Sequence, residues 1–161
     1  MNNIARTVHV NAPLGLLADK YLEKFIDNMI NPEIGLDAKE LDRFSKDDFS
    51  RIAKRLRERG LSVTIHGPFL DLSPGSPDSL VWNLTKKRYE QALVAVSIFK
   101  PRTFVCHAGY DSKRYGYVRE AWMEKSVEMW NWLSRRLANE GAKLMLENVY
   151  EHRPRSEEHT S

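Results

Sequence analysis

The sequence predicts an α/β fold in which a parallel sheet curves into part of a barrel. Predicted strands alternate along the chain with predicted helices. Neighbouring parallel strands need a crossover of about the length of such a helix, so this order favours a parallel sheet. One side-chain parity of the predicted strands is apolar, whereas the other carries polar groups. This pattern suits a barrel with a helix-covered face and an enclosed face, because an open doubly wound sheet is apolar on both.

Five strands are expected, each recognised by its alternation and by the turn signal that follows it. The third ends at His66, directly before the turn residues Gly67 and Pro68, and the fourth has the same construction at His107. In chain order the predicted strands are 7–11, 33–36, 61–66, 103–107 and 143–148.

Four helices are expected between these strands, at about 16–29, 46–58, 79–99 and 118–139. Asp78 or Ser79 can cap the third helix, and Gly60 and Gly141 stand where the second and fourth should end. These intervals complete the strand and helix alternation.

The apolar parity of the strands is expected to pack under the helices. Cys106 belongs to this parity, so we interpret it as a small buried hydrophobic residue and not as a nucleophile. The full set is Val8, Val10, Ile34, Leu36, Leu61, Val63, Ile65, Phe104, Cys106, Leu144 and Leu146.

The length predicts only part of a (β/α)₈ TIM barrel. A whole barrel takes about 250 residues, and the chain has 161. We therefore expect residues 1–154 to be the N-terminal part of one truncated domain, with the first five strands and four helices. Residues 155–161, RSEEHTS, are the in-frame translation of the start of a widely used sequencing adapter, AGATCGGAAGAGCACACGTCT. This tail is expected to be non-native, and the natural gene to continue.

Composition narrows the class of protein. The formal net charge is +3, with Lys and Arg interspersed among Asp and Glu, which does not favour a nucleic-acid partner. The single cysteine excludes an internal disulfide, and no apolar stretch follows a basic N-terminus. A cytoplasmic protein without a signal peptide or membrane span is therefore expected.

Three metal-capable side chains stand at consecutive strand ends with the same parity: His66, His107 and Glu147. Functional residues of such barrels lie at the C-terminal ends of strands, and neighbouring strands are about 4.8 Å apart. The three side chains are therefore expected to share one divalent cation. Two imidazoles and a carboxylate suit Zn²⁺, Mn²⁺, Fe²⁺ or Co²⁺ better than Mg²⁺ or Ca²⁺.

Other polar residues are candidates for contacts with substrate. His9 and Asn11, expected at the end of the first strand, and Glu33 in the second point into the same enclosed space. A lone inward histidine such as His9 is more often a hydrogen-bonded core residue. Asp111, in the loop after the fourth strand, could also meet a substrate.

The segments HGPFLDLSPGS at 66–76, VCHAGYD at 105–111 and LMLENVYE at 144–151 resemble the xylose isomerase-like TIM barrels. This superfamily includes sugar isomerases and epimerases and the endonuclease IV class of AP endonucleases. The resemblance implies that His66, His107 and Glu147 bind metal, with Glu147 also moving a proton in the sugar branch. It further implies that later strands, six to eight, supply the remaining ligands.

Two functions follow as hypotheses. The first is a metal-dependent sugar or sugar phosphate isomerase or epimerase, with a carbohydrate or related polyol as substrate. The alternative is an endonuclease IV-like zinc phosphodiesterase acting on nucleic acid. The pair of histidines favours the second, whereas the lack of a basic, aromatic surface disfavours it. A third possibility is an inactive fragment of either enzyme.

Overall fold

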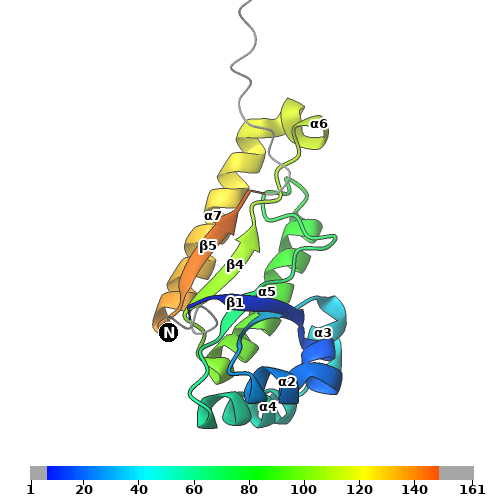
Figure 1. Ribbon diagram of the computed structural model, residues 1–161. Helices are drawn as coiled ribbons and strands as arrows, with labels where there is room; N and C mark the ends of the chain where they lie inside the picture. Colours follow the sequence, from blue (N-terminus) through cyan, green and yellow to red (C-terminus); the bar gives the residue numbers. More distant parts are fainter. Residues whose placement is uncertain (1–6, 149–161) are drawn as a thin grey trace, which may run out of the picture.

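A computed structural model describes residues 7–148. Its centre is a parallel sheet in the order β1-β2-β3-β4-β5, which confirms the predicted α/β fold. Every hydrogen-bonded pair of strands is parallel, so the C-terminal ends of all five strands lie at one edge. The strands are β1 (His9–Pro13), β2 (Asn31–Gly35), β3 (Thr64–His66), β4 (Thr103–His107) and β5 (Lys143–Glu147) (Figure 1).

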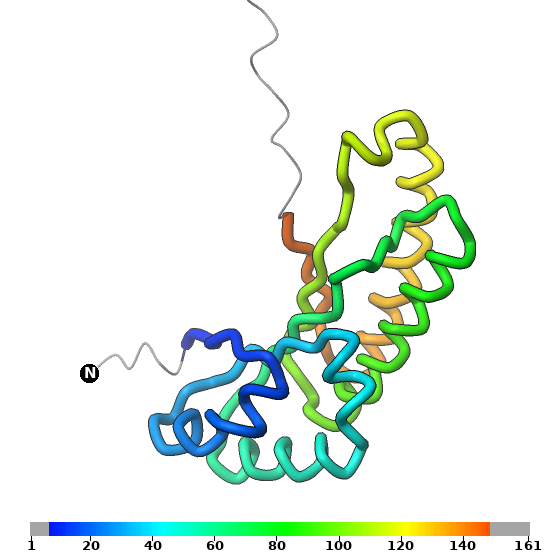
Figure 2. Tube along the Cα trace, turned by 90° about the vertical axis from the view of Figure 1, so that its right-hand side faces the viewer, coloured from blue at the N-terminus to red at the C-terminus, as the bar shows by residue number. Residues whose placement is uncertain are grey.

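The helices follow the strands in alternation and form an outer layer around the sheet (Figure 2). α5 and α7 run beside the sheet, while α4 lies below it. No helix among the described residues has the length and apolar character needed to cross a membrane. The helical segments are α1 (Leu14–Leu16), the π-helix η2 (Leu17–Tyr21), α2 (Leu22–Asp27), α3 (Ala38–Arg43), α4 (Lys46–Glu58), α5 (Ser79–Phe99), α6 (Ser112–Tyr115), the 3₁₀ helix η3 (Gly116–Val118) and α7 (Arg119–Asn139).

Local sequence explains where the long helices begin and end. Ser45 and Asp48 form a capping box at α4, with each side chain accepting a hydrogen bond from the other residue's backbone N–H. Asp78 caps α5 by accepting from the backbone N–H of Leu80 at 2.8 Å, as predicted. Gly60 and Gly141 follow α4 and α7 with φ of 67° and 78°, a conformation that glycine adopts at helix C-termini.

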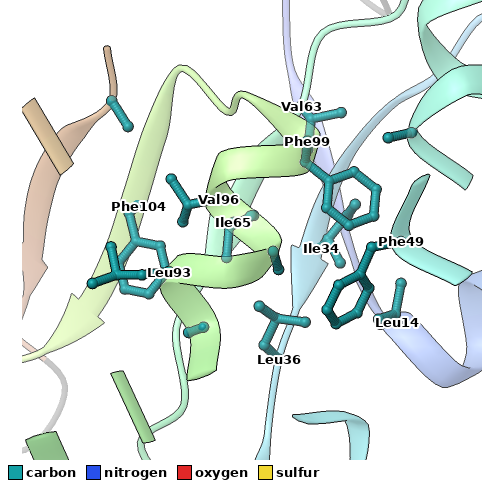
Figure 3. Close-up of a cluster of buried hydrophobic side chains, with 14 of the residues drawn as sticks. Leu14, Ile34, Leu36, Phe49, Val63, Ile65, Leu93, Val96, Phe99 and Phe104 are labelled. Atoms are coloured by element: carbon teal, nitrogen blue, oxygen red, sulfur yellow. The ribbon is translucent and has the colours of Figure 1, made fainter. Parts of the chain in front are cut away.

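The hydrophobic core lies between the helices and the outward face of β2, β3 and β4. Ile34, Ile65 and Phe104 point from the sheet toward α5, and none of the three is exposed. Leu93 and Val96 of α5 pack against them (Figure 3). Each large apolar side chain buried in this way contributes about 1.5–3 kcal/mol. The apolar parity predicted for the central strands is therefore confirmed.

The same parity prediction is wrong for three residues in or beside the two outer strands, whereas Leu144 of β5 packs against the core as predicted. Val8 and Val10 are 45% and 44% exposed, and Leu146 is 47% exposed. β1 and β5 each pair on one side only, and the described helices bury the central strands more completely than these edges. Residues of the right parity thus remain in contact with water where the outer layer does not reach them.

Several element boundaries also differ from expectation. β1 begins at His9, two residues later than predicted, so His9 opens the strand and does not lie at its end. The short helices α3 and α6 were not predicted, because segments of six and four residues contain too little periodicity to recognise. The expected non-native tail lies outside the described residues.

Gly67 fixes the end of β3, and replacing it should destabilise the fold. Its backbone N–H donates to the carbonyl oxygen of Val105 at 2.8 Å, while a Cβ atom on Gly67 would lie 2.6 Å from the ring of Phe104. Phe104 is fully buried and cannot move aside freely. We expect Gly67→Ala to lower the free energy of unfolding by about 1–3 kcal/mol, as overpacking does.

The matched control is Gly116→Ala, because a Cβ at Gly116 meets no atom within 4 Å. Urea unfolding followed by circular dichroism compares the two variants with the parent chain. Equal midpoints for Gly67→Ala and Gly116→Ala would contradict the packing argument.

Cys106 should be chemically silent in the folded protein. Its side chain is fully buried on the helix-facing side of β4, and this burial raises the pKa of the thiol well above its ordinary value. We expect no reaction with a thiol-specific chromogenic reagent in native buffer and complete reaction in strong denaturant. Rapid labelling under native conditions would show that the β4 core is not formed.

Candidate metal centre

His66 is held at the end of β3 by backbone contacts on both sides. Its carbonyl oxygen accepts from the backbone N–H of Leu36 at 2.9 Å, which ties it to the segment after β2. The next residue, Gly67, bonds to β4 through Val105. Because neither neighbour can shift without breaking the sheet, the imidazole of His66 projects from a fixed backbone.

His107 and Glu147 stand opposite each other at the ends of β4 and β5, where the register pairs them directly. The backbone N–H of Ala108 continues this ladder by donating to the carbonyl oxygen of Glu147 at 3.3 Å. The two side chains share a parity and leave the sheet on its inner face. This register brings the ends of three consecutive strands to one point.

The three side chains converge as the strand-end argument predicts. Nε2 of His66 lies 3.1 Å from Nε2 of His107, and Oε2 of Glu147 lies 3.8 Å and 3.6 Å from these two nitrogens. One ligand atom from each residue falls within 4.8 Å of the others. The histidine side chains are 12% exposed and that of Glu147 is 54% exposed, so the carboxylate forms the open side.

The hydrogen bond made by Nδ1 of His66 determines whether Nε2 can act as a metal ligand. Nδ1 lies 3.0 Å from the carbonyl oxygen of Gly67, and a carbonyl can only accept. Nδ1 of His66 therefore carries the proton, which leaves the lone pair of Nε2 directed at His107 and Glu147. A backbone carbonyl behind an imidazole is the usual support for a metal-binding histidine.

Phe69 is a residue at this site that sequence reasoning missed. Its ring centroid lies 4.2 Å from that of His107 and 5.4 Å from that of His66, so it covers both imidazoles. The ring is itself 39% exposed. The signal was present in the HGPF segment, where Phe69 follows the turn after His66. An apolar ring therefore lies against both imidazoles of the candidate centre.

Two of the predicted substrate contacts, Asn11 and Glu33, contact each other. The amide Nδ2 of Asn11 donates to Oε1 of Glu33 at 3.0 Å, between β1 and β2. Asn11 also borders the hollow beside His66 and His107. Their role in substrate binding stays a prediction.

The other two predicted contacts lie elsewhere. His9 is at the opposite end of the inner face, where its Nε2 lies 3.0 Å from Oγ of Ser62 and burial, with Arg102 nearby, lowers its pKa. Asp111 accepts from the backbone N–H of Lys113 at 2.9 Å and caps α6. Neither residue belongs to the cluster of three metal-capable side chains. The contacts of His9 fit a hydrogen-bonded core histidine better than a substrate-binding residue at the end of a strand.

A hollow of about 400 Å³ adjoins the two histidines. It lies over the C-terminal ends of the first four strands. A ligand of the candidate centre could therefore occupy this hollow. A larger hollow of about 720 Å³ lies along Gly116–Glu124, but none of the three metal-capable residues borders it. The residues around the smaller hollow are Asn11, Pro13, Gly35, Leu36, Asp37, Glu40, His66, Phe69 and His107.

Solved structures of similar fold include sugar epimerases. A D-tagatose 3-epimerase-like protein matches with a TM-score of 0.70 and 17% identity over 91% of this chain and 55% of its own. The 3-keto-D-glucoside 4-epimerase of E. coli matches with a TM-score of 0.59 and 19% identity over 80% and 51%. A protein from Thermus thermophilus, TTHB071, soaked with ZnCl₂, matches with a TM-score of 0.66 and 23% identity over 88% and 55%.

These likenesses establish the fold, and the chain spans about half the length of the solved proteins it matches. No curated protein matches the sequence. A family model does match, over residues 32–159, and it describes the xylose isomerase-like TIM barrel. That match includes all three metal-capable strand ends. The chain therefore belongs to the xylose isomerase-like TIM barrel family.

Proposed function

We propose that the chain carries part of the active site of a divalent-metal-dependent sugar isomerase or epimerase. The observation that carries this proposal is the convergence of His66, His107 and Glu147 within 4.8 Å at the ends of adjacent strands. The lone pair of Nε2 in His66 already points into that cluster, because its Nδ1 proton is held by Gly67.

The donor set favours a particular class of cation. Two imidazole nitrogens and one carboxylate suit Zn²⁺, Mn²⁺ or Co²⁺, whose bonds to such ligands are about 2.0–2.2 Å for zinc. The ligand atoms stand 3.1–3.8 Å apart, which is the spacing expected around an ion with bonds of that length. When bound, the cation would polarise neighbouring oxygens of a sugar and acidify the adjoining C–H.

Glu147 would have two roles at this site. Its Oε2 faces both histidines, and its side chain is 54% exposed, so the carboxylate is open to a ligand at the candidate centre. A carboxylate in that position can accept a proton from a substrate carbon and return it, which is the step that isomerases and epimerases need. His66 and His107 would hold the ion, and Phe69 would restrict water.

The names of the structural neighbours support the sugar branch, since they include tagatose, psicose and keto-glucoside epimerases. Two observations favour an endonuclease IV-like zinc phosphodiesterase as a second candidate: the paired histidines, and a structural neighbour that was soaked with zinc chloride. The lining of the hollow speaks against a phosphate substrate, because none of the described residues that border it is Lys or Arg.

We further propose that residues 1–154 are the N-terminal part of a longer barrel, with residues 155–161 non-native. The half-length coverage of the solved neighbours supports the longer barrel. So does an apolar groove of about 380 Å³ beside β5, bordered by Met123, Val127 and Leu146, where the next strand and helix would pack. Later strands would supply further ligands, and an inactive fragment is the alternative for the chain alone.

Removing one proposed ligand should weaken zinc binding. We expect His107→Ala to lower the affinity for Zn²⁺ by at least about 100-fold, since even the loss of a residue that only supports a ligand costs about 10–100-fold. His9→Ala is the matched control, because His9 lies on the same face of the sheet but outside the cluster. Competition with a chromogenic zinc chelator measures both. Equal affinities of the two variants would refute the proposed site.

Completing the barrel should improve the site. A longer gene product that contains the later strands should bind Zn²⁺ or Mn²⁺ more tightly than the 161-residue chain, because it would add ligands and enclose the ion. Isothermal titration of both proteins gives affinity and stoichiometry. Assays of the longer product on ketoses and on abasic DNA, with and without metal, then separate the two candidate activities. Equal metal affinity would mean that the site in this chain is already complete.

A further inference from the structure

Two acidic residues that are not part of the candidate metal centre border the hollow beside it. Asp37 and Glu40, which follow β2 in the chain, border it together with His66 and His107. Asp37 caps α3, and its Oδ1 accepts from the backbone N–H groups of Lys39 at 2.7 Å and Glu40 at 3.1 Å. We call this space the acidic hollow.

The pKa values of the two carboxyl groups of the acidic hollow are shifted in opposite directions. Glu40 is only 7% exposed, and burial together with the neighbouring charge of Asp37 raises its pKa. A side-chain hydrogen bond from Glu40 lowers the pKa of Asp37. Of the two carboxyl groups, Asp37 is therefore the one that carries a negative charge more readily. A ligand that enters the hollow therefore meets a carboxylate that can accept hydrogen bonds from it.

Positive side chains lie near this pair but do not border the hollow: Lys39 helps to lower the pKa of Asp37, and neither Lys39 nor Arg43 is among the lining residues. Arg43, on the same short helix as Glu40, forms a two-pronged ion pair with Asp19, with both N–O distances at 2.8 Å. The backbone N–H groups at the start of α3 are already bonded to Asp37. Among the described residues that border the hollow, Asn11 and the two histidines are the only side chains with N–H groups.

We propose that the acidic hollow binds the uncharged, hydroxyl-bearing end of the substrate, and that Asp37 selects it by accepting hydrogen bonds from its hydroxyl groups. This inference rests on the proposed function, because it places the reacting oxygens of the same sugar at the cation. A hydroxyl can donate to a carboxylate, whereas a phosphate offers only acceptors and a like charge. Phe69 adds an apolar surface for the C–H face of a sugar ring or chain. The preferred substrate is therefore a free polyol and not a sugar phosphate.

The test compares a free ketose with its phosphate on the same protein. Mn²⁺ is added to the 161-residue chain, its binding is measured by electron paramagnetic resonance, and the relaxation of ligand protons reports D-fructose or D-fructose 6-phosphate at the ion. We expect D-fructose to bind at least about tenfold more tightly, since like-charge contacts cost several kcal/mol. Its terminal hydroxymethyl protons should relax less than the protons nearest the carbonyl.

Asp37→Asn isolates the contribution of the carboxylate. Asparagine caps helices about as well as aspartate, so α3 should remain intact. We expect this variant to bind D-fructose about tenfold more weakly and to lose the preference over the phosphate. Asp42→Asn is the matched control, because Asp42 is on the same helix but pairs with Arg88 outside the hollow. It should behave as the parent chain.

The outcomes separate this inference from the function on which it rests. Failure of Mn²⁺ to bind would overturn the proposed function and the inference with it. Normal Mn²⁺ binding with no bound D-fructose, with equal or tighter binding of the phosphate, or with an unchanged preference in Asp37→Asn would overturn the acidic hollow alone.

Discussion

The parallel register of β3, β4 and β5 is the constraint on which the rest of this protein depends. Neighbouring parallel strands stand about 4.8 Å apart and end at the same edge, so side chains of one parity at their ends must meet. His107 and Glu147 are directly paired, and His66 is held beside them by bonds to both neighbouring strands. The packing of Gly67 against Phe104 fixes that edge from the core side. The fold and the candidate metal centre therefore depend on the same few residues.

The two faces of the sheet differ in burial and polarity, and this difference is lost at the outer strands. The outward face of the central strands is buried under helices, while the inward face carries polar groups that contact one another across strands, as Asn11 and Glu33 do. At β1 and β5 the outward apolar residues stay in contact with water. A sheet that curves without meeting its other end has this consequence, and a longer barrel would cover both edges.

The sequence was sufficient to predict which strand residues share a face and which strand ends lie side by side, because both follow from the two-residue period of strands and from strand order. The parity rule and the turn after His66 were sufficient to bring His66, His107 and Glu147 together. The same rule placed His9 wrongly, because a short alternating run fixes the phase of a strand but not where it begins. Glu40 could not be found in this way, because the burial of a glutamate in a short polar helix depends on tertiary contacts between distant elements. Phe69 follows the turn after His66 in the sequence, but its contact with the ring of His107 depends on tertiary structure.

The central claim is that three strand ends share one divalent cation, and X-ray absorption of the zinc-loaded protein tests it directly. A spectrum with two imidazole ligands at about 2.0–2.1 Å, with the remaining scatterers oxygen and none sulfur, is the predicted result. It should be accompanied by one ion per chain, with one imidazole lost in His66→Ala. A spectrum of hydrated zinc without imidazole scattering, or one unchanged in His66→Ala, would contradict the claim.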